Sequence, residues 1–241
     1  MSVTIMFPAY NEGENLALLL PKINAAMKEI EPDYEILVVD TMQPTDNTEQ
    51  VAFENCAVYV RREGGNAYGD AIRTGFRRAS KDYLLVMDAD GSHSPDELKA
   101  LLTDREKYDL TIGSRYVKGG KTDNPPVLIA MSKMVNIAFR LVLGIKAKDV
   151  SNSLRVYKTA DVKDITPALL SDNFDLVEEI LIRLIVKNKD LRIREVPITF
   201  NKRVHGESKR ELLKFVFTYA VTLRRLLKVK RQARKEVKAS K

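Results

Sequence analysis

Two aspartates separated by one residue carry the clearest chemical signal in the chain. Asp88 and Asp90 follow residues 83–87, an apolar run that predicts a buried strand. Side chains two positions apart on an extended segment can point the same way, so two carboxylates can flank one hard cation. Magnesium and manganese prefer such oxygen ligands and leave room for substrate phosphate. A lone Asp-x-Asp is more often a solvated loop, but the preceding strand and Gly91 favour a metal site.

Other polar residues near this pair have structural explanations. His93 is expected to line the loop rather than to bind metal. Residues 94–97 read Ser-Pro-Asp-Glu, which combines a helix cap, a first-turn proline and an acidic first turn. The glycine-rich run at 64–69 lacks the Lys-Ser/Thr of a P-loop, so its glycines are expected at turns and close contacts.

Alternating strands and helices would position these groups. Strands are predicted at residues 3–7, 35–39, 58–60, 83–87 and 110–112, with helices that begin at Asn11 through an Asn-x-x-Glu capping box, at Asp46, over 67–79 and at Ser94. Further helices at 128–143 and 176–186 and strands at 154–157 and 193–200 are expected to complete the sheet and cover the site. This order predicts an α/β fold, a doubly wound, mostly parallel sheet with helices on both faces.

The predicted strands end in polar groups. The first ends at residues 8–12, the second at Asp40 and the fourth at Asp88. Ligands bind beyond the carboxyl ends of such strands, where the strand order reverses, so these groups are expected to converge. Asp40 itself is equally consistent with capping the residues that follow it and with contacting a ligand.

Charge and cysteine content exclude several classes of protein. The single cysteine forbids an intrachain disulfide, and two histidines cannot build a His/Cys metal cage, so a metal site must rest on carboxylates. The net charge is +7, but residues 210–241 hold eleven basic and two acidic residues, a net of +9, which leaves about −2 for residues 1–209. An acidic body argues against nucleic-acid binding.

The C-terminal segment combines apolar residues at helical spacing from Leu212 with a polybasic end. This pattern predicts a helix that lies on a membrane surface, and the alternative is a helix packed on the body with a solvated end. No secretory signal is evident and no 18-residue window is free of charge, so no membrane span is expected. The predicted location is cytoplasmic, peripheral on the cytoplasmic face of the membrane.

Eight segments between residues 3 and 210 form a more specific pattern. They are FPAYNEGENL, YEILVVD, GDAIRTGF, YLLVMDADGSHSP, IGSRYVKGG, the Ser-Lys-x-x-Asn at 132–136, DVSNSLRVYK and EVPITFNKRVHGESK. In this order they resemble family 2 glycosyltransferases, in particular the dolichyl-phosphate mannosyltransferase (polyprenyl-phosphate glycosyltransferase) branch. The resemblance implies a glycosyltransferase A-type fold, a catalytic domain over 1–210 before the helix at 211–241, a nucleotide-sugar donor (commonly GDP-mannose), Mg²⁺ or Mn²⁺, and a polyprenyl phosphate acceptor.

The resemblance also implies roles for individual residues. The nucleoside would be held by Pro8, Tyr10, Glu12, Val38 and Asp40. The metal and diphosphate would be held by Asp88, Ala89 and Asp90, and the donor phosphates would be neutralised by Arg115, Arg203 and Lys209. The acceptor phosphate would lie near Arg115, Ser132 and Lys133. Catalysis would rest chiefly on Asp90, Arg203 and Lys209, with residues 201–209 closing over the diphosphate.

The chain departs from this family at three places. Residues 40–43 read Asp-Thr-Met-Gln where the family usually has Asp-Asp-Gly-Ser, which leaves the base and sugar preference open. Lys133 stands where an arginine is common, and His205 where an aromatic residue is common. The expected reaction is one in-line, inverting displacement by an acceptor phosphate that is already anionic near neutral pH. The alternatives are another lipid or saccharide acceptor and a catalytically idle, nucleotide-binding membrane scaffold; a membrane-protein partner is also left open.

Overall fold

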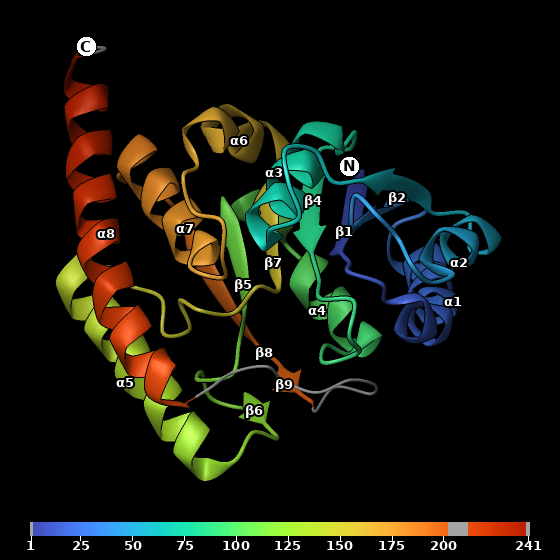
Figure 1. Cartoon of the computed structure of the whole chain (residues 1–241), viewed down its shortest axis with the longest axis horizontal. Coiled ribbons are helices and arrows are strands. Elements are labelled where there is room, and N and C mark those ends of the chain that lie inside the picture. The colour runs from blue at the N-terminus through green and yellow to red at the C-terminus, as the bar shows by residue number, and fades with distance from the viewer. Residues whose placement is uncertain (1, 202–211, 240–241) are drawn as a thin grey trace.

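The computed structural model of the chain describes residues 2–201 and 212–239 (Figure 1). Arg203, His205 and Lys209, and most of the segment predicted to close over the diphosphate, lie outside the described residues. The predictions for these three residues therefore stay predictions.

A seven-stranded sheet forms the centre of the molecule. In spatial order its strands are β3 (Val58–Arg61), β2 (Tyr34–Asp40), β1 (Val3–Pro8), β4 (Tyr83–Val86), β7 (Arg155–Lys158), β5 (Leu110–Ser114) and β8 (Ile193–Pro197). Only β7 runs antiparallel to its neighbours among these strands. The predicted mostly parallel sheet is confirmed. The strand expected at 193–200 is broken, because β9 (Thr199–Phe200) leaves the main sheet to pair with β6 (Lys121–Thr122).

Helices cover both faces of this sheet (Figure 1). One face is covered by α1 (Gly13–Ile30), α2 (Thr48–Glu54) and α4 (Leu98–Leu102), and the other by α3 (Tyr68–Arg78), α5 (Pro126–Leu143), α6 (Thr159–Ile165), α7 (Leu176–Lys187) and α8 (Leu212–Ala239). Alternation along β1 separates the two apolar clusters, since Met6 packs under α3 while Ile5 and Phe7 pack under α1. The two-faced α/β architecture is therefore confirmed.

The start of α1 differs from its prediction. The capping box from Asn11 does not form, because Asn11 adopts a left-handed φ of 56° and the helix begins at Gly13. Its first amides are capped instead by side chains of the loop before α2: the Gly13 amide donates to Asp46 Oδ2 at 2.8 Å and the Glu12 amide to Thr48 Oγ1 at 3.0 Å. This brace ties the loop after β1 to the loop after β2.

Two long helices, α5 and α8, run side by side at one edge of the molecule (Figure 1). Thr222, Leu226 and Val229 of α8 are buried, so this part of the helix packs on the body, as the alternative prediction had it. The expectation that no segment suits a membrane span needs correction. By length and composition α5 qualifies, because its mean hydropathy reaches 1.6 although it contains Lys133 and Arg140.

Candidate active site

Three strand ends meet at one edge of the sheet. β1 lies between β2 and β4 and runs parallel to both, so the strand order reverses at β1. In register, Pro8 pairs with Val39 and Met6 pairs with Val86. Pro8, Asp40 and Asp88 therefore leave the sheet at the same edge, and the predicted convergence is confirmed.

The acidic pair forms a tight turn directly after β4. Asp88 Oδ2 accepts a 2.8 Å hydrogen bond from Ser153 Oγ, and His93 Nε2 lies 3.4 Å from the same oxygen. Asp90 is 6% exposed, and its Oδ1 accepts the Ser92 amide at 3.0 Å. The Asp88 side chain is 28% exposed and thus available to a ligand, whereas Ala89 is buried and packs in the core under α1 and α4.

These residues fit a hard divalent cation. Asp88 and Asp90 would supply two carboxylates, and the described residues contain no cluster of three or more His, Cys, Asp or Glu side chains that could form a complete metal cage. Such a cation keeps several waters or substrate oxygens, so two protein ligands are sufficient. Ser92 Oγ is buried beside the pair without a hydrogen-bond partner among the described residues, and a metal-bound water would satisfy it.

The predicted nucleoside residues divide into exposed and buried groups. The Tyr10 side chain is 56% exposed, with the Arg62 guanidinium 5.5 Å from its ring centroid. Glu12 lies beside it in the chain and is partly exposed, with Oε2 accepting the Asn15 amide group at 2.6 Å. Pro8, at the end of β1, is also partly exposed, and the nucleoside roles of these three residues stay predictions.

Asp40 and Val38, which the family resemblance assigned to the nucleoside, are fully buried. The Asp40 carboxylate is fully buried and accepts the Asn11 amide and the Tyr59 hydroxyl, each at 3.1 Å. Burial and the negative charge of Asp40 raise the pKa of Tyr59 to about 12. Asp40 therefore holds the loop after β1. Val38 is corrected to a packing residue, because its side chain is fully buried in the cluster under α1.

Arg62 organises this side of the site and was missed from the sequence. It is 5% exposed, and its guanidinium donates to the carbonyls of Ala9, Asp40, Asn66 and Ala67. Burial lowers the pKa of Arg62. Its position directly after the β3 strand, where polar groups of the other strands were found, is the signal that could have identified it.

The unusual residues after Asp40 are held by Asn66. Asn66 Oδ1 accepts the Thr41 hydroxyl and the Met42 amide, both at 2.9 Å. Thr41 is buried, while the Met42 side chain is 46% exposed. The glycines expected at turns are confirmed on either side, since Gly64 has a φ of +92° and a Cβ on Gly69 would lie 2.5 Å from the Ser171 carbonyl oxygen.

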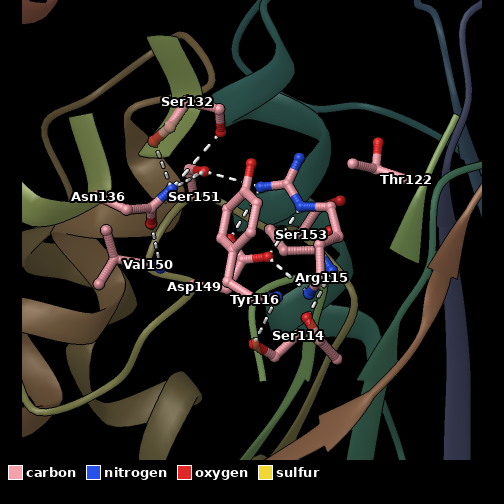
Figure 2. A network of polar contacts seen from close by, with 12 residues as sticks. Ser114, Arg115, Tyr116, Thr122, Ser132, Asn136, Asp149, Val150, Ser151 and Ser153 are labelled. Atoms are coloured by element: carbon pink, nitrogen blue, oxygen red, sulfur yellow. Dashed lines mark hydrogen bonds and ion pairs between the residues drawn. The ribbon is translucent and has the colours of Figure 1, made fainter. Parts of the chain in front are cut away.

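Arg115 and Ser132, two of the three predicted acceptor residues, lie within one polar network (Figure 2). Arg115, directly after β5, forms a bidentate ion pair with Asp149, and each of the two bonds is 2.8 Å long. Arg115 Nη2 also donates to Ser151 Oγ at 3.0 Å, and Ser151 Oγ accepts Asn136 Nδ2 at 3.3 Å. Asn136 Nδ2 donates to the Ser132 carbonyl at 2.8 Å. The network therefore joins β5, α5 and residues 149–153.

Lys133 reaches the same place from the exposed side of α5. Its Nζ lies 5.9 Å from the centroid of the Tyr116 ring, and the Arg115 guanidinium lies 5.1 Å from that centroid. Both distances suit cation–π contacts. Arg115, Ser132 and Lys133, which come from two elements, are thus brought together as predicted, although their roles stay predictions.

Asp149, Ser151 and Ser153 were not predicted as site residues, although their segment, DVSNSLRVYK, was one of the eight that carry the family resemblance. These three residues occupy alternate positions in the segment before β7, and their side chains bond to Arg115, Asn136 and Asp88 of the site. That alternation of polar residues is the signal that could have assigned them. Arg155, next in the same series, is fully buried and donates to the carbonyls of Val150, Asn152 and Val177, which fixes the backbone of the segment.

Solved structures place this architecture in a known class. A crystal structure of glucosyl-3-phosphoglycerate synthase from Mycobacterium tuberculosis in complex with phosphoglyceric acid matches with a TM-score of 0.69 at 17% identity, over 95% of this chain and 79% of that one. The same enzyme with Mn²⁺, uridine diphosphate and glucosyl-3-phosphoglycerate matches with a TM-score of 0.66 at 16% identity, over 96% and 79% of the two chains. The chain has a glycosyltransferase A-type fold.

Sequence relatives define the family. Residues 4–166 match Glycosyl transferase family 2, and the chain belongs to this family. It is 34% identical over 242 residues to the dolichol-phosphate mannosyltransferase of Pyrococcus furiosus, covering 95% of this chain and 64%, less than two thirds, of that protein. It is 36% identical over 219 residues to the undecaprenyl-phosphate mannosyltransferase of Micrococcus luteus, covering 87% of each. The family resemblance inferred from the eight segments is confirmed.

Proposed function

We propose that the chain transfers a mannosyl group from a nucleoside diphosphate sugar, GDP-mannose, to the phosphate of a polyprenyl phosphate. The observation that carries the proposal is that one fold contains both a candidate metal and donor site and a separate candidate site for the acceptor phosphate. Asp88 and Asp90 stand at the switch point of the sheet, and a cluster of Arg115, Ser132 and Lys133 lies beyond β5. The names of the similar mannosyltransferases support the same sugar and acceptor.

The donor would bind at the switch point. Asp88 and Asp90 would hold Mg²⁺ or Mn²⁺, which neutralises the diphosphate as it leaves. Tyr10 and Glu12 would contact the nucleoside from the loop that Arg62 and Asp40 fix. Arg203 and Lys209 are assigned to the donor phosphates by the family resemblance alone. Fixed positive charge aimed at the leaving group lowers the barrier most when it is in place before the reaction.

The acceptor phosphate would bind beside Arg115. Because Asp149 neutralises the Arg115 charge, the exposed ammonium of Lys133 would supply the net attraction, while Arg115 and Ser132 would provide directional contacts. A phosphate monoester has a second pKa of about 6, so its oxygen attacks without a strong general base. The protein's task is then to align the oxygen in line with the departing diphosphate, which inverts the anomeric carbon.

The acceptor's isoprenoid chain would stay in the lipid at the edge formed by α5 and α8. The α5 surface exposes five large apolar side chains, Val127, Met134, Ile137, Leu141 and Val142. Basic side chains of α8 are exposed at Arg224, Lys228, Arg231, Arg234 and Lys235. Apolar insertion and attraction to anionic lipid together give peripheral binding, at the cytoplasmic face in this proposal.

A transfer assay tests the proposal. The purified chain is incubated with radiolabelled GDP-mannose or UDP-glucose, with Mn²⁺ or EDTA, and with polyprenyl phosphate in anionic vesicles, a soluble saccharide or no acceptor. We expect a labelled glycolipid only with GDP-mannose, metal and polyprenyl phosphate. A product on the soluble saccharide would support the alternative acceptor. Nucleotide binding without any product would support the idle scaffold and contradict the proposal.

A further inference from the structure

Asn136 is a buried amide side chain on α5, at a position where an apolar residue would be expected for packing. α5 buries only three of its eighteen residues, Asn136, Phe139 and Leu143, and Asn136 is 2% exposed. An amide at such a position is unfavourable unless all of its polar atoms are bonded. An apolar residue would pack there without that requirement, so the bonds that Asn136 makes indicate its purpose.

The bonds of Asn136 connect the two halves of the candidate acceptor site. Its Oδ1 accepts the Val150 amide at 2.6 Å, and its Nδ2 donates to the Ser132 carbonyl at 2.8 Å and to Ser151 Oγ at 3.3 Å (Figure 2). Ser151 Oγ in turn accepts Arg115 Nη2 at 3.0 Å. One side chain thus fixes the turn of α5 that carries Ser132 and, through one hydroxyl, the guanidinium of Arg115.

The segment that receives these bonds is itself rigidly held. The amides of Lys148 and Asp149 donate to the Glu195 carboxylate on β8, at 2.8 and 3.0 Å. Asp149 Oδ2 also accepts the Arg115 amide at 3.0 Å. Residues 149–153 are therefore fixed to β5 and β8, while α5 faces the exterior with much of its apolar surface uncovered. Asn136 provides polar contacts between the fixed segment and this exposed helix.

We infer that Asn136 is a positioning residue for the acceptor. It sets the distance and orientation of Ser132 and Lys133 relative to Arg115, so that a phosphate delivered along α5 meets all three groups in one geometry. The inference rests on the proposed function and deepens it. It assigns the placement of α5, the helix proposed to face lipid, relative to the reaction centre to a residue that touches neither substrate. Ser151 belongs to the same connection, since both of its lone pairs accept N–H donors and its own proton remains to donate.

Kinetics of Asn136→Ala test the inference. We expect the KM for polyprenyl phosphate to rise about tenfold, because displacement of a binding group by a fraction of an ångström weakens the contacts that hold the acceptor. The KM for GDP-mannose and the nucleotide Kd should stay within about twofold of the wild-type values, since the donor site rests on β1, β2 and β4. Ser151→Ala should raise the acceptor KM less, and the double variant should be no worse than Asn136→Ala, because both act on one connection.

Leu143→Ala is the matched control, because it removes buried apolar packing from the same helix two turns further on, while the substitution keeps the backbone carbonyl of Leu143, which accepts a hydrogen bond from Lys230. If this variant raises the acceptor KM as much as Asn136→Ala does, or if the donor KM rises in parallel, Asn136 only supports the fold and the inference is wrong. Faster hydrogen exchange at the Val150 amide of Asn136→Ala shows that the connection has been broken. If the wild-type chain forms no glycolipid, the proposed function is wrong, and the inference with it. If the wild type forms glycolipid and Asn136→Ala has the same acceptor KM, the inference alone is wrong.

Discussion

Replacing Arg62 with methionine should damage both stability and nucleotide binding. The guanidinium makes four hydrogen bonds, to carbonyls of the loop after β1, the end of β2 and the loop after β3, and each bond from a charged donor is worth at least about 1.5 kcal/mol. The buried charge is unfavourable, as the lowered pKa of Arg62 indicates, and its removal offsets about half of the loss. We therefore expect Arg62→Met to lower the free energy of unfolding by about 3 kcal/mol.

Urea unfolding followed by circular dichroism measures this loss, because the chain contains no tryptophan to serve as a fluorescent probe. With an m-value of about 3 kcal/mol/M, the midpoint should fall by about 1 M. The neighbouring Arg61→Met is the control: Arg61 is exposed, its ion pair with Glu49 spans 3.5 Å, and its loss should cost under about 0.5 kcal/mol. We also expect about tenfold weaker nucleotide binding in Arg62→Met alone. Equal midpoints and equal nucleotide affinities in the two variants would refute the reasoning.

Three further perturbations follow from individual contacts. Asp90→Ala should abolish Mn²⁺-dependent nucleotide binding in calorimetry while the chain stays folded, with about 1 kcal/mol of stability lost for the bond to the Ser92 amide alone; undiminished Mn²⁺-dependent affinity would exclude a metal role. Arg192 holds the pKa of Asp109 well below its usual range, so the stability that Asp109 provides is full at neutral pH and is lost as the pH falls below about 4 toward the folded-state pKa. Asp109→Asn should accordingly lower the free energy of unfolding by about 1–2 kcal/mol at pH 7, with the difference from wild type shrinking in urea titrations at lower pH; a difference independent of pH would contradict this linkage. The exposed basic residues of α8 can be replaced with glutamine, namely Arg224, Lys228, Arg231, Arg234 and Lys235. This variant should float less with anionic vesicles, because its attraction to anionic lipid is lost, while its nucleotide affinity stays unchanged. Equal flotation of variant and wild type at low salt would show that α8 contributes only packing.

The deletion of residues 224–241 would be a poorer test of membrane binding than this charge replacement. Leu226 and Val229 are buried against the body, and Arg225 bonds with Ser171 and Asp175. Truncation would therefore remove core contacts together with the basic charge, and a loss of binding could come from unfolding. Exchange of exposed side chains alone leaves these contacts intact.

Local patterns predicted the sheet, its two covered faces and the convergence of strand ends. Apolar runs and polar strand ends are visible in the sequence because side-chain alternation is a local property. The start of α1 could not be predicted, because its capping groups Asp46 and Thr48 lie 33 and 36 positions from the amides they accept. The burial of Asp40 could not be predicted for the same reason, since Tyr59 of β3 bonds to its carboxylate and Arg62, directly after β3, bonds to its carbonyl.

The acceptor side required the family resemblance. Arg115, Ser132 and Lys133 have no common spacing, and nothing in their local sequence relates a strand end to a helix. The pairing of Arg115 with Asp149 spans 34 positions and depends on the order of β5 and β7 in the sheet. The helix at α5 was predicted, but the exposure of its apolar side was not, because sequence periodicity does not reveal which face is left uncovered.

The structure of the product tests the central claim most directly. Nuclear magnetic resonance of the glycolipid formed from GDP-mannose and polyprenyl phosphate reports both the linkage and the anomeric configuration. The account predicts one mannosyl residue in phosphodiester linkage to a single phosphate, in the β configuration, because a direct displacement by the acceptor oxygen inverts the α-linked donor. An α-linked product, or mannose attached to anything other than that phosphate, would contradict it.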